Sequence, residues 1–469
     1  MFATITNRRN RCSKLSDADD NFLIRLLRIV ATVSGQPSPA VATETQHKFS
    51  ILVAAPAGAH ATLGTLTVVR RLVNAHPRAD ISGFCDSRFH RVRDAFEANF
   101  RDRNEVGAAV AVWVDGDLAV NLWGGTASLT RRELWRQDTL ASIFSGSKAL
   151  TSTCVHLLAD RGELNLDDPV ARYWPEFAQA GKHDITVATV MGHRSGVIGP
   201  RERLAPEETL DWDAVCTQIA RAEPWWQPGS AQGYHMVTFG FILGEVVRRV
   251  TGRTLGEYLR REVAEPLGID VHIGLPEAEH SRCADMVNKP HIRDVLANGG
   301  APGYPTSIDE HPMAAFSVAM GFVPDDELGS NDINAWRAAE FPATNAHVSA
   351  LGLATFYNAL AQGKLLTYEH MEKCRISQGG FDTDVVLGPR VADHGWGLGY
   401  MLNQRGVNGP NTRTFGHGGS GGSFGFVDLE HRIGYAYVMN NFDATKCNAD
   451  PRSVALSTEV YSALGVATD

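Results

Sequence analysis

Paired and clustered cysteines are missing from this sequence. Its 469 residues include seven cysteines, none of which forms a CxxC pair. An odd number of scattered thiols favours neither a disulfide framework nor a zinc knuckle, and it indicates a reducing compartment. We therefore expect a cytoplasmic protein, with association with the cell envelope as the alternative. The cysteines are Cys12, Cys85, Cys154, Cys216, Cys283, Cys374 and Cys447.

The sequence also lacks a metal-binding motif and an excess of basic residues. Its seventeen histidines form no HExxH motif and no comparably tight cluster, so we expect no metal and no other cofactor. The formal net charge is −9, whereas a nucleic-acid-binding surface would be basic. We therefore expect no nucleic-acid partner. The apolar content of 43% is ample for a large buried core.

No long hydrophobic run and no convincing export signal occurs near the N-terminus. Residues 22–33 are apolar but contain two arginines and follow acidic residues, whereas a signal peptide begins with basic ones. Residues 51–69 carry no formal charge, yet proline, histidine and threonine make them weakly hydrophobic. We expect residues 1–80 to be a poorly structured leader, with membrane contact disfavoured but left open, and residues 81–469 to form the working domain.

Three patterns predict local structure in the first half of that domain. Residues 106–114 and 117–123 are apolar, β-branched runs around Asp-Gly, which predicts a hairpin. Residues 145–159 place apolar side chains at helical spacing before Gly162, which predicts a buried helix. The middle third is mainly helical, and its clearest helix is predicted over residues 237–250.

Strand patterns return towards the C-terminus, and a final helix is predicted over residues 453–464. Consecutive strands with short links imply an antiparallel sheet. The predicted fold is α/β in the wider sense, or α+β: an antiparallel sheet flanked by helices, with a helical subdomain inserted at about residues 167–300. The C-terminal strands are expected at residues 395–402, 412–417, 424–429 and 434–440.

Ser145-Gly146-Ser147-Lys148 stands at the start of the predicted buried helix. The spacing of three places Ser145 and Lys148 on one helical face, and the helix N-terminus offers N–H groups to developing negative charge. Burial would lower the pKa of Lys148 from about 10.4 and make it a base for the serine. Chance occurrence is the competing explanation, because one such tetrapeptide is expected in a chain of this length.

Two further segments could complete a site for nucleophilic catalysis. Tyr234 follows a Pro-Gly turn, where its phenol could relay a proton, although a buried aromatic that only packs is the simpler interpretation. A glycine run containing His417, Gly418, Gly419 and Ser420 ends a predicted strand. Backbone there can approach a ligand and donate N–H groups, although a plain hairpin loop would look similar.

The same glycine run contains a G-x-S-x-G match centred on Ser420. In α/β-hydrolases this motif joins a strand to a helix. Here a strand is predicted to follow, and His431 is the only histidine left in the chain after the motif. We therefore reject Ser420 as the nucleophile.

Taken together and in this order, the motifs resemble the penicillin-recognising serine hydrolases. The similar branch includes class C β-lactamases, D-alanyl-D-alanine carboxypeptidases and family VIII carboxylesterases, and the resemblance covers roughly residues 85–465. The supporting segments are LWGG at 122–125, SGSK at 145–148, MGHRSGV at 191–197, PGSAQGY at 228–234 and FGHGGSGG at 415–422, followed by Phe426 and Asp428.

The resemblance implies a role for each residue. Ser145 would attack a carbonyl carbon, Lys148 and Tyr234 would handle its proton, and the N–H groups of Ser145 and Ser420 would bind the oxyanion. His417, Gly418 and Gly419 would form the substrate-binding strand. Which of Lys148 and Tyr234 is the base is left open, because coupled groups share their titration.

Departures from the family pattern indicate the substrate. The β-lactamases have Tyr-x-Asn where this chain has Tyr234, His235 and Met236, and Lys-Thr-Gly where it has His417, Gly418 and Gly419. The amide and the permanent cation that would bind an anionic peptide-like substrate are thus replaced. The expected substrate is a neutral small-molecule acyl ester, and the expected activity is that of a serine carboxylesterase acting through an acyl-enzyme.

Three alternatives to the carboxylesterase are kept. The first is a β-lactamase or D-alanyl-D-alanine carboxypeptidase, and the second is an acyltransferase that uses the same residues. The third is a non-catalytic scaffold of the same fold, which loss of Ser145, Lys148 or Tyr234 would have signalled. The sequence predicts neither the acyl chain length nor the oligomeric state.

Overall fold

The computed structural model separates the chain into two compact units, residues 1–74 and 75–469. In the first unit, β1 (Phe49–Ser50) pairs antiparallel with β2 (Thr65–Leu66). Most of the predicted leader, residues 1–80, lies outside the described residues. The structure describes residues 49–50, 65–66, 79–200, 206–287, 333–379, 383–387, 395–404, 406, 409–443 and 450–467.

The second unit contains an eight-stranded sheet with the strand order β10-β11-β12-β13-β4-β5-β3, to which β6 adds by pairing with β5. Every pairing in it is antiparallel, as predicted. The strands are β3 (Ser82–Cys85), β4 (Gly107–Val114), β5 (Asp117–Ser128), β6 (Glu133–Leu134), β10 (Met401–Leu402), β11 (Phe415–Gly418), β12 (Phe424–Asp428) and β13 (Ile433–Met439).

Both faces of this sheet are buried, and successive side chains of a strand point to opposite faces. In β4, Val110 and Val112 pack towards α2 and α15, while Ala109 and Ala111 face the larger core on the other side. Successive strand residues point to opposite faces, so a strand buried on both sides is apolar throughout. This explains the continuous apolar run predicted as the first strand of the hairpin.

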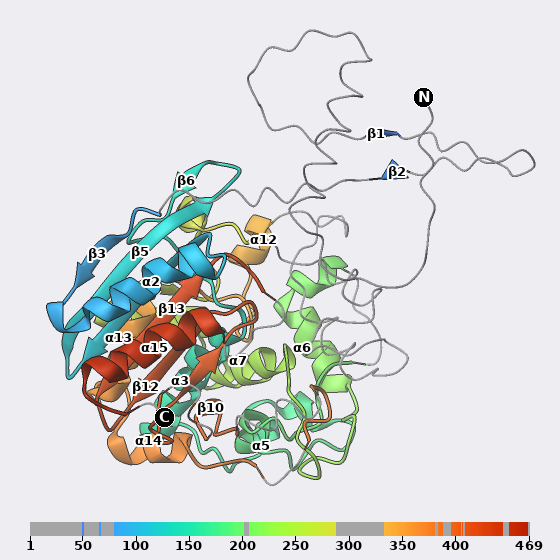
Figure 1. Ribbon diagram of the computed structural model, residues 1–469. Helices are drawn as coiled ribbons and strands as arrows, with labels where there is room; N and C mark the ends of the chain where they lie inside the picture. Colours follow the sequence, from blue (N-terminus) through green and yellow to red (C-terminus); the bar gives the residue numbers. More distant parts are fainter. Residues whose placement is uncertain are drawn as a thin grey trace, which may run out of the picture. The chain divides into compact units, whose positions relative to one another are not determined.

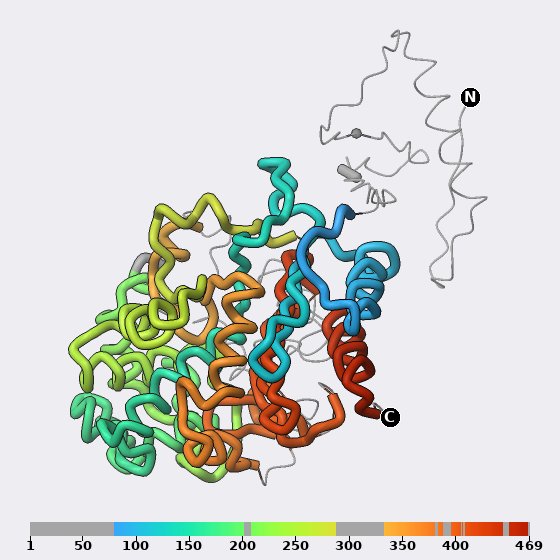
Figure 2. The backbone as a smooth tube through the Cα atoms, turned by 90° about the vertical axis from the view of Figure 1, so that its left-hand side faces the viewer, coloured from blue at the N-terminus to red at the C-terminus, as the bar shows by residue number. Residues whose placement is uncertain are grey.

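Helices cover the two faces of the sheet (Figure 1). Helix α2 and the C-terminal helix α15 lie side by side on one face, and α13 packs on β13, β12 and β4. Figure 2 shows α2 in blue and α15 in red on the same side of the sheet, away from the other helices. The bounds here are η1 (Ser87–Phe89), α2 (His90–Asp102), α13 (Ala350–Ala361), α14 (Tyr368–Cys374) and α15 (Pro451–Ala463).

Between β7 and β8 the described chain is mainly helical. The small sheet β7-β9-β8 connects this region to the segment that contains Ser145. The small-sheet strands are β7 (Ala141–Ser142), β8 (Val271–His272) and β9 (His347–Val348). The helices and turns are η2 (Phe144–Gly146), α3 (Ser147–Asp160), α4 (Val170–Tyr173), η3 (Pro175–Ala178), α5 (Val187–Met191), η4 (Pro206–Leu210), α6 (Trp212–Arg221), α7 (Thr238–Thr251), α8 (Leu255–Leu259), η5 (Arg260–Ala264), α9 (Glu265–Leu267), then η6 (Glu277–Arg282) and α12 (Ile333–Ala338).

Most sequence-based elements are confirmed to within a few residues. The predicted strand over residues 395–402 is wrong in extent, because only β10 is extended there. Gly395 and Gly399 adopt φ of +64° and +82°, a left-handed conformation that breaks a strand. Among the described helices, none has the length and apolarity needed to cross a membrane.

Candidate active site

Ser145 lies in a short turn that the small sheet holds in place. Strand β7 ends at Ser142, and the N–H of Ile143 donates to the carbonyl of Ala346 beside β9 at 3.0 Å. The turn η2 follows and leads directly into α3. Ser145 is half-buried while its neighbours are buried, so the chain presents this hydroxyl just before the buried helix, which begins at Ser147 and not at Ser145 as predicted.

The residue before Ser145 has an unusual backbone conformation. Phe144 has φ of +45°, which is uncommon for a side chain of this size and carries strain of about 1–3 kcal/mol. Its ring packs edge-on against Phe442, with the ring centroids 5.4 Å apart. The Ser147 hydroxyl donates to the carbonyl of Phe144 and accepts the N–H of Ala346. Packing and these two bonds hold the nucleophile turn in its strained form.

Lys148 is fully buried on the first turn of α3. Its Nζ donates to the carbonyls of Met236 at 2.8 Å and Ala343 at 3.0 Å. It lies 4.7 Å from the ring centroid of Tyr234. Burial lowers the pKa of this amine well below its ordinary value. A neutral amine has two N–H groups, so both can go to carbonyls while the lone pair remains available for a proton.

Tyr234 lies among aromatic rings with 6% of its surface exposed. Trp396 stacks on it with ring centroids 5.1 Å apart, and His193 lies 4.8 Å from it on a tilted plane. The His417 ring is 6.4 Å away. Tyr234 therefore connects Lys148 on α3 with the end of β11. The stacked rings restrict the motion of the Tyr234 side chain.

Asp384 also supports Tyr234, and no sequence motif pointed to it. The carboxylate is 2% exposed, and its Oδ1 accepts the Tyr234 N–H at 3.1 Å. The same oxygen accepts the N–H groups of Val386 and Leu387, both at 2.9 Å. Burial raises the pKa of Asp384. A lone aspartate in a loop carries no sequence signal, which is why it was missed.

His235 and Ser195 form a buried pair behind Tyr234. Because His235 Nδ1 donates to the carbonyl of Gly233 at 2.7 Å, its Nε2 accepts the Ser195 hydroxyl at 2.6 Å. The backbone N–H of His235 donates to Nδ1 of the His193 ring at 3.2 Å. Burial lowers the pKa of His235 to about 4. Both members are fully buried, so this pair braces the tyrosine segment and cannot reach a substrate.

The glycine run at the end of β11 lies directly against the nucleophile turn. A Cβ added to Gly419 would be 2.0 Å from the carbonyl oxygen of Ile143 and 3.6 Å from the nitrogen of Gly146. No side chain fits into that space, so glycine is needed for this close approach. The structure thus brings Ser420 next to Ser145, two residues that are 275 positions apart in the chain.

The turn after Gly419 determines where the N–H of Ser420 points. The Gly419 carbonyl accepts the Gly422 N–H at 3.2 Å inside the turn. In a trans peptide the N–H points opposite to the carbonyl, so the Ser420 N–H points out of the turn. The turn joins β11 to β12, which places Ser420 in a hairpin and not in a strand-to-helix elbow.

His417 and Gly418, which are predicted to belong to the substrate-binding strand, are both buried in the structure. His417 Nδ1 donates to the carbonyl of Gly418 at 2.7 Å. His417 pairs with Gly425 and Gly418 with Phe424 in the β11–β12 ladder. Gly418 is therefore the last residue of the strand, and the loop begins at Gly419.

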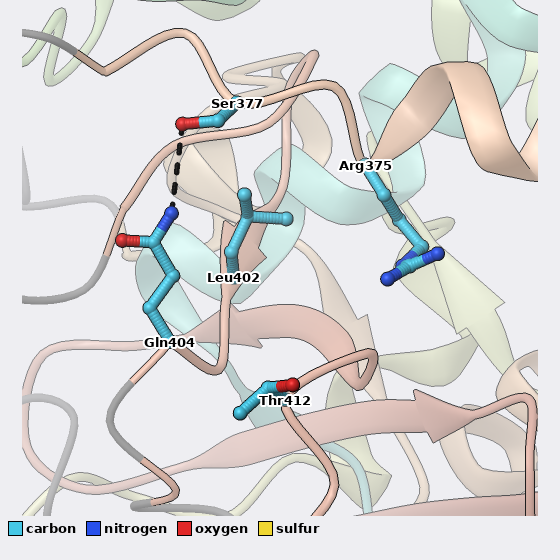
Figure 3. Close-up of a pocket in the computed structure, with 5 residues that line it drawn as sticks. All are labelled: Arg375, Ser377, Leu402, Gln404 and Thr412. Atoms are coloured by element: carbon cyan, nitrogen blue, oxygen red, sulfur yellow. Dashed lines mark hydrogen bonds between the residues drawn. The ribbon is translucent and has the colours of Figure 1, made fainter.

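A separate hollow opens on the other side of the β10 edge (Figure 3). It has a volume of about 290 Å³ and contains none of the predicted site residues. Leu402 lines it, whereas the preceding Met401 points the opposite way and packs with Tyr234 and Trp396. The hollow is lined by Arg375, Ser377, Leu402, Gln404 and Thr412.

Within the described residues, no group of three or more His, Cys, Asp or Glu side chains could hold a metal ion. The groups that the described residues bring together at the candidate site are a serine hydroxyl, a buried amine, a phenol and backbone N–H groups.

Comparison with known proteins identifies the family. The beta-lactamase family model matches residues 92–458. An esterase/beta-lactamase LipL of Mycobacterium tuberculosis is 31% identical over 80% of this chain and 87% of its own length. The esterase EstB of Burkholderia gladioli is 26% identical over 79% of this chain and 95% of its own length.

Solved structures agree with this assignment. A family VIII carboxylesterase is 38% identical, with a TM-score of 0.72 over 82% of this chain and 100% of that chain. A penicillin-binding protein homologue from Caulobacter crescentus is 37% identical, with the same TM-score and the same coverage. This chain belongs to the beta-lactamase family of penicillin-recognising serine hydrolases.

Proposed function

We propose that this protein is a serine carboxylesterase that cleaves small neutral esters through an acyl-enzyme on Ser145. The observation that carries the proposal is the environment of Lys148, which is buried and bonded to two carbonyls three residues after a half-buried serine. A lysine placed in this way is a base and not a counter-ion. The esterase names of the related proteins support the ester as substrate class.

In the acylation step, Lys148 Nζ takes the proton of Ser145 as Oγ attacks the carbonyl carbon of the ester. The new Oγ–C bond makes a tetrahedral intermediate with a negative oxygen. The N–H groups of Ser145 and Ser420 stabilise that oxygen. When the bond to the alcohol breaks, Tyr234 gives a proton to the leaving oxygen and is reprotonated by Lys148. The alcohol leaves and the acyl-enzyme remains.

Deacylation repeats the same transfers with water as the nucleophile. As the water oxygen attacks the acyl carbon, Tyr234 takes a proton from it and passes its own proton to Lys148. Lys148 then gives that proton to Ser145 Oγ as the ester bond to the enzyme breaks. The carboxylic acid product leaves. An alcohol in place of water would give acyl transfer by the same route, and product analysis distinguishes the two.

The side chains around the site favour neutral substrates over anionic ones. Met236 is half-buried where the β-lactamases have an asparagine, so it offers an apolar contact. The His417 imidazole is bonded to the backbone where they have a lysine. The guanidinium of Arg452, near the glycine run, is 2% exposed and is held by buried carboxylates. A substrate carboxylate would thus not find its usual cationic partner in His417 or Arg452.

The test is a direct comparison of substrates with the purified protein. We expect turnover of nitrophenyl esters with short and medium acyl chains, a mass increase of Ser145 by one acyl group during turnover, and an intact chromogenic cephalosporin. Rapid cephalosporin hydrolysis with slow ester hydrolysis would instead assign the protein to the amide-cleaving branch. Absence of both reactions would favour a scaffold.

The chain organisation and location that we propose are those expected from the sequence. Residues 1–80 would be a leader, and residues 81–469 the hydrolase domain with a helical insertion at about 167–300. The compact unit of residues 75–469 supports this division. A cytoplasmic location is supported by the free cysteines in the described part of the chain.

Replacing Tyr234 with phenylalanine removes only the hydroxyl, because Trp396 and His193 still hold the ring. We expect kcat/KM for alkyl esters, which reports acylation, to fall about 10²–10³-fold, within the range for loss of a general acid. The kcat/KM for nitrophenyl esters should fall much less, because their leaving group needs no proton. Rates for both ester classes, measured side by side, check this difference.

The matched control for that variant is Tyr400→Phe, which removes a buried hydroxyl bonded to Thr153. Equal losses for alkyl and nitrophenyl esters in Tyr234→Phe would contradict the role in leaving-group protonation. Tyr400→Phe should leave both rates within about twofold, since its hydroxyl supports α3 and not the reacting atoms.

A further inference from the structure

Arg452 lies in the first turn of α15, on the side of the sheet opposite to α3, and is 2% exposed. All five of its N–H groups have acceptors, which is the full donor capacity of a guanidinium. Two of the acceptors are backbone carbonyls. Nε donates to Asp450; Nη1 donates to Glu105 Oε1 at 3.2 Å and to the Asn441 carbonyl at 3.0 Å; Nη2 donates to Asp450 Oδ2 at 2.7 Å and to the Gly421 carbonyl at 2.9 Å.

The two carboxylates that hold the guanidinium are themselves fixed. Asp450 caps α15, and its Oδ1 accepts the backbone N–H of Arg452 at 2.8 Å. Glu105 is fully buried before β4, where it accepts the Val106 N–H and the Tyr437 hydroxyl. Charge-assisted bonds to fixed partners give the guanidinium one position. The direction of its two bonds to backbone carbonyls is therefore fixed as well.

Both of these carbonyls belong to loops that surround the nucleophile turn. Gly421 directly follows Ser420 in the turn after β11. Asn441 precedes Phe442, whose ring packs against Phe144 next to Ser145. A Cβ on Gly421 would be 2.5 Å from the Phe442 ring, so the two loops are in contact. Arg452 thus links the loop that carries the Ser420 N–H to the loop that packs against the nucleophile turn.

We propose that Arg452 is a positioning residue for the oxyanion site. Its bond to the Gly421 carbonyl orients the Gly421–Gly422 peptide, whose N–H donates to the Gly419 carbonyl and so sets the direction of the Ser420 N–H. The inference rests on the proposed function, in which that N–H binds the oxyanion. An oxyanion donor must be held within a fraction of an ångström, and a shift of about 1 Å reduces catalysis on the order of 10²-fold. The competing explanation is that the buried ion pair only stabilises the start of α15.

The test uses Arg452→Lys, which keeps the charge but has three N–H donors in place of five and no planar fork. Such a side chain cannot hold both carboxylates and both carbonyls. We expect kcat to fall about 10–100-fold with little change in KM. The affinity for phenylboronic acid, which forms a tetrahedral adduct that mimics the intermediate, should fall by a similar factor. Titration calorimetry measures that affinity without turnover.

Tyr435→Phe is the matched control. The Tyr435 hydroxyl is buried and bonded to Ser453, the residue after Arg452, and the bond supports the same turn of α15 without reaching the glycine run. We expect it to lower the unfolding temperature while kcat and phenylboronic acid affinity stay within about twofold. Should Arg452→Lys not fold, Glu105→Gln, which keeps the acceptor but removes the charge, should lower kcat and boronate affinity together by about threefold to tenfold.

The outcomes separate this inference from the proposed function. If Arg452→Lys behaves like Tyr435→Phe, with lower stability but unchanged kcat and boronate affinity, the positioning role is wrong and the esterase proposal stands. If the wild-type protein neither hydrolyses esters nor binds phenylboronic acid, the proposed function fails and this inference fails with it. A joint fall of kcat and boronate affinity at unchanged KM supports the positioning role.

Discussion

Replacing Ser145 with alanine is expected to lower kcat for ester hydrolysis by a factor on the order of 10⁶, the size of effect seen when a catalytic serine is removed. The reason is that no acyl-enzyme can form without the hydroxyl. The fold should be unaffected, because the turn is held by Ser147, Phe144 and the bond between Ile143 and Ala346. Initial rates with a nitrophenyl ester and the unfolding temperature measure both effects.

Ser420→Ala is the matched control for that prediction. Both serines lie in turns of the same site, and Ser420 also stands at the centre of the G-x-S-x-G match. We expect its rate to stay within about tenfold of the wild type, because the variant keeps the backbone N–H. Complete loss of activity in a folded Ser420→Ala alone, with activity remaining in Ser145→Ala, would mean that the nucleophile has been assigned to the wrong serine.

The elements that position this site could largely be predicted from local patterns. The hairpin of β4 and β5 follows from two apolar runs around Asp115 and Gly116, whose φ values of +52° and +89° fit a tight turn. Helix α7 ends at Gly252 in the left-handed conformation, as the C-terminal glycine indicates. These features depend on neighbouring residues alone, so the sequence is sufficient for them.

The supporting residues could not be predicted, because their role depends on contacts between distant segments. Asp384 binds the backbone of Tyr234 from a loop 150 positions later. Arg452 reaches Gly421 and Glu105 across the sheet. Neither has a motif around it. The strand that contains β10 was predicted too long for a related reason. Trp396 stacks on Tyr234 from a segment that turns at Gly395 and Gly399, so this segment is not extended.

Lys148 and Lys182 allow a controlled test of the general base. Both side chains are fully buried. Lys182 donates to three carbonyls, those of Gln179, Ala220 and Ala222, which satisfies a charged ammonium completely, and its pKa is lowered by burial to about 8. Lys148 donates to only two carbonyls, and its pKa falls well below the ordinary value. Lys182 therefore serves as the structural lysine of the comparison, and Lys148 is the lysine that we propose as the base.

Lys148→Met should therefore lower kcat at least about 10³-fold, since it removes the base but keeps the apolar stem. Lys182→Met should lose stability and keep its kcat, because its ammonium is bonded to the carbonyls of Gln179, Ala220 and Ala222 and not to a group of the candidate site. Ester hydrolysis and denaturant unfolding of the two variants measure these opposite effects. Full activity in a folded Lys148→Met would leave Tyr234 as the base and overturn the assignment.

The pH dependence of stability provides an independent check of the Lys148 protonation state. Above its lowered folded-state pKa, Lys148 is neutral in the folded protein but protonated in the unfolded chain, up to about pH 10.4. The unfolded state then binds the extra proton, so raising the pH stabilises the folded wild type relative to Lys148→Met by up to about 1.4 kcal/mol per pH unit. For Lys182→Met the same slope should begin only above a pH of about 8. Denaturant unfolding measured at several pH values on either side of 7 therefore separates the two lysines. A slope for Lys148 that also begins only near pH 8 would mean that the amine is charged at neutral pH and needs another group to accept the Ser145 proton.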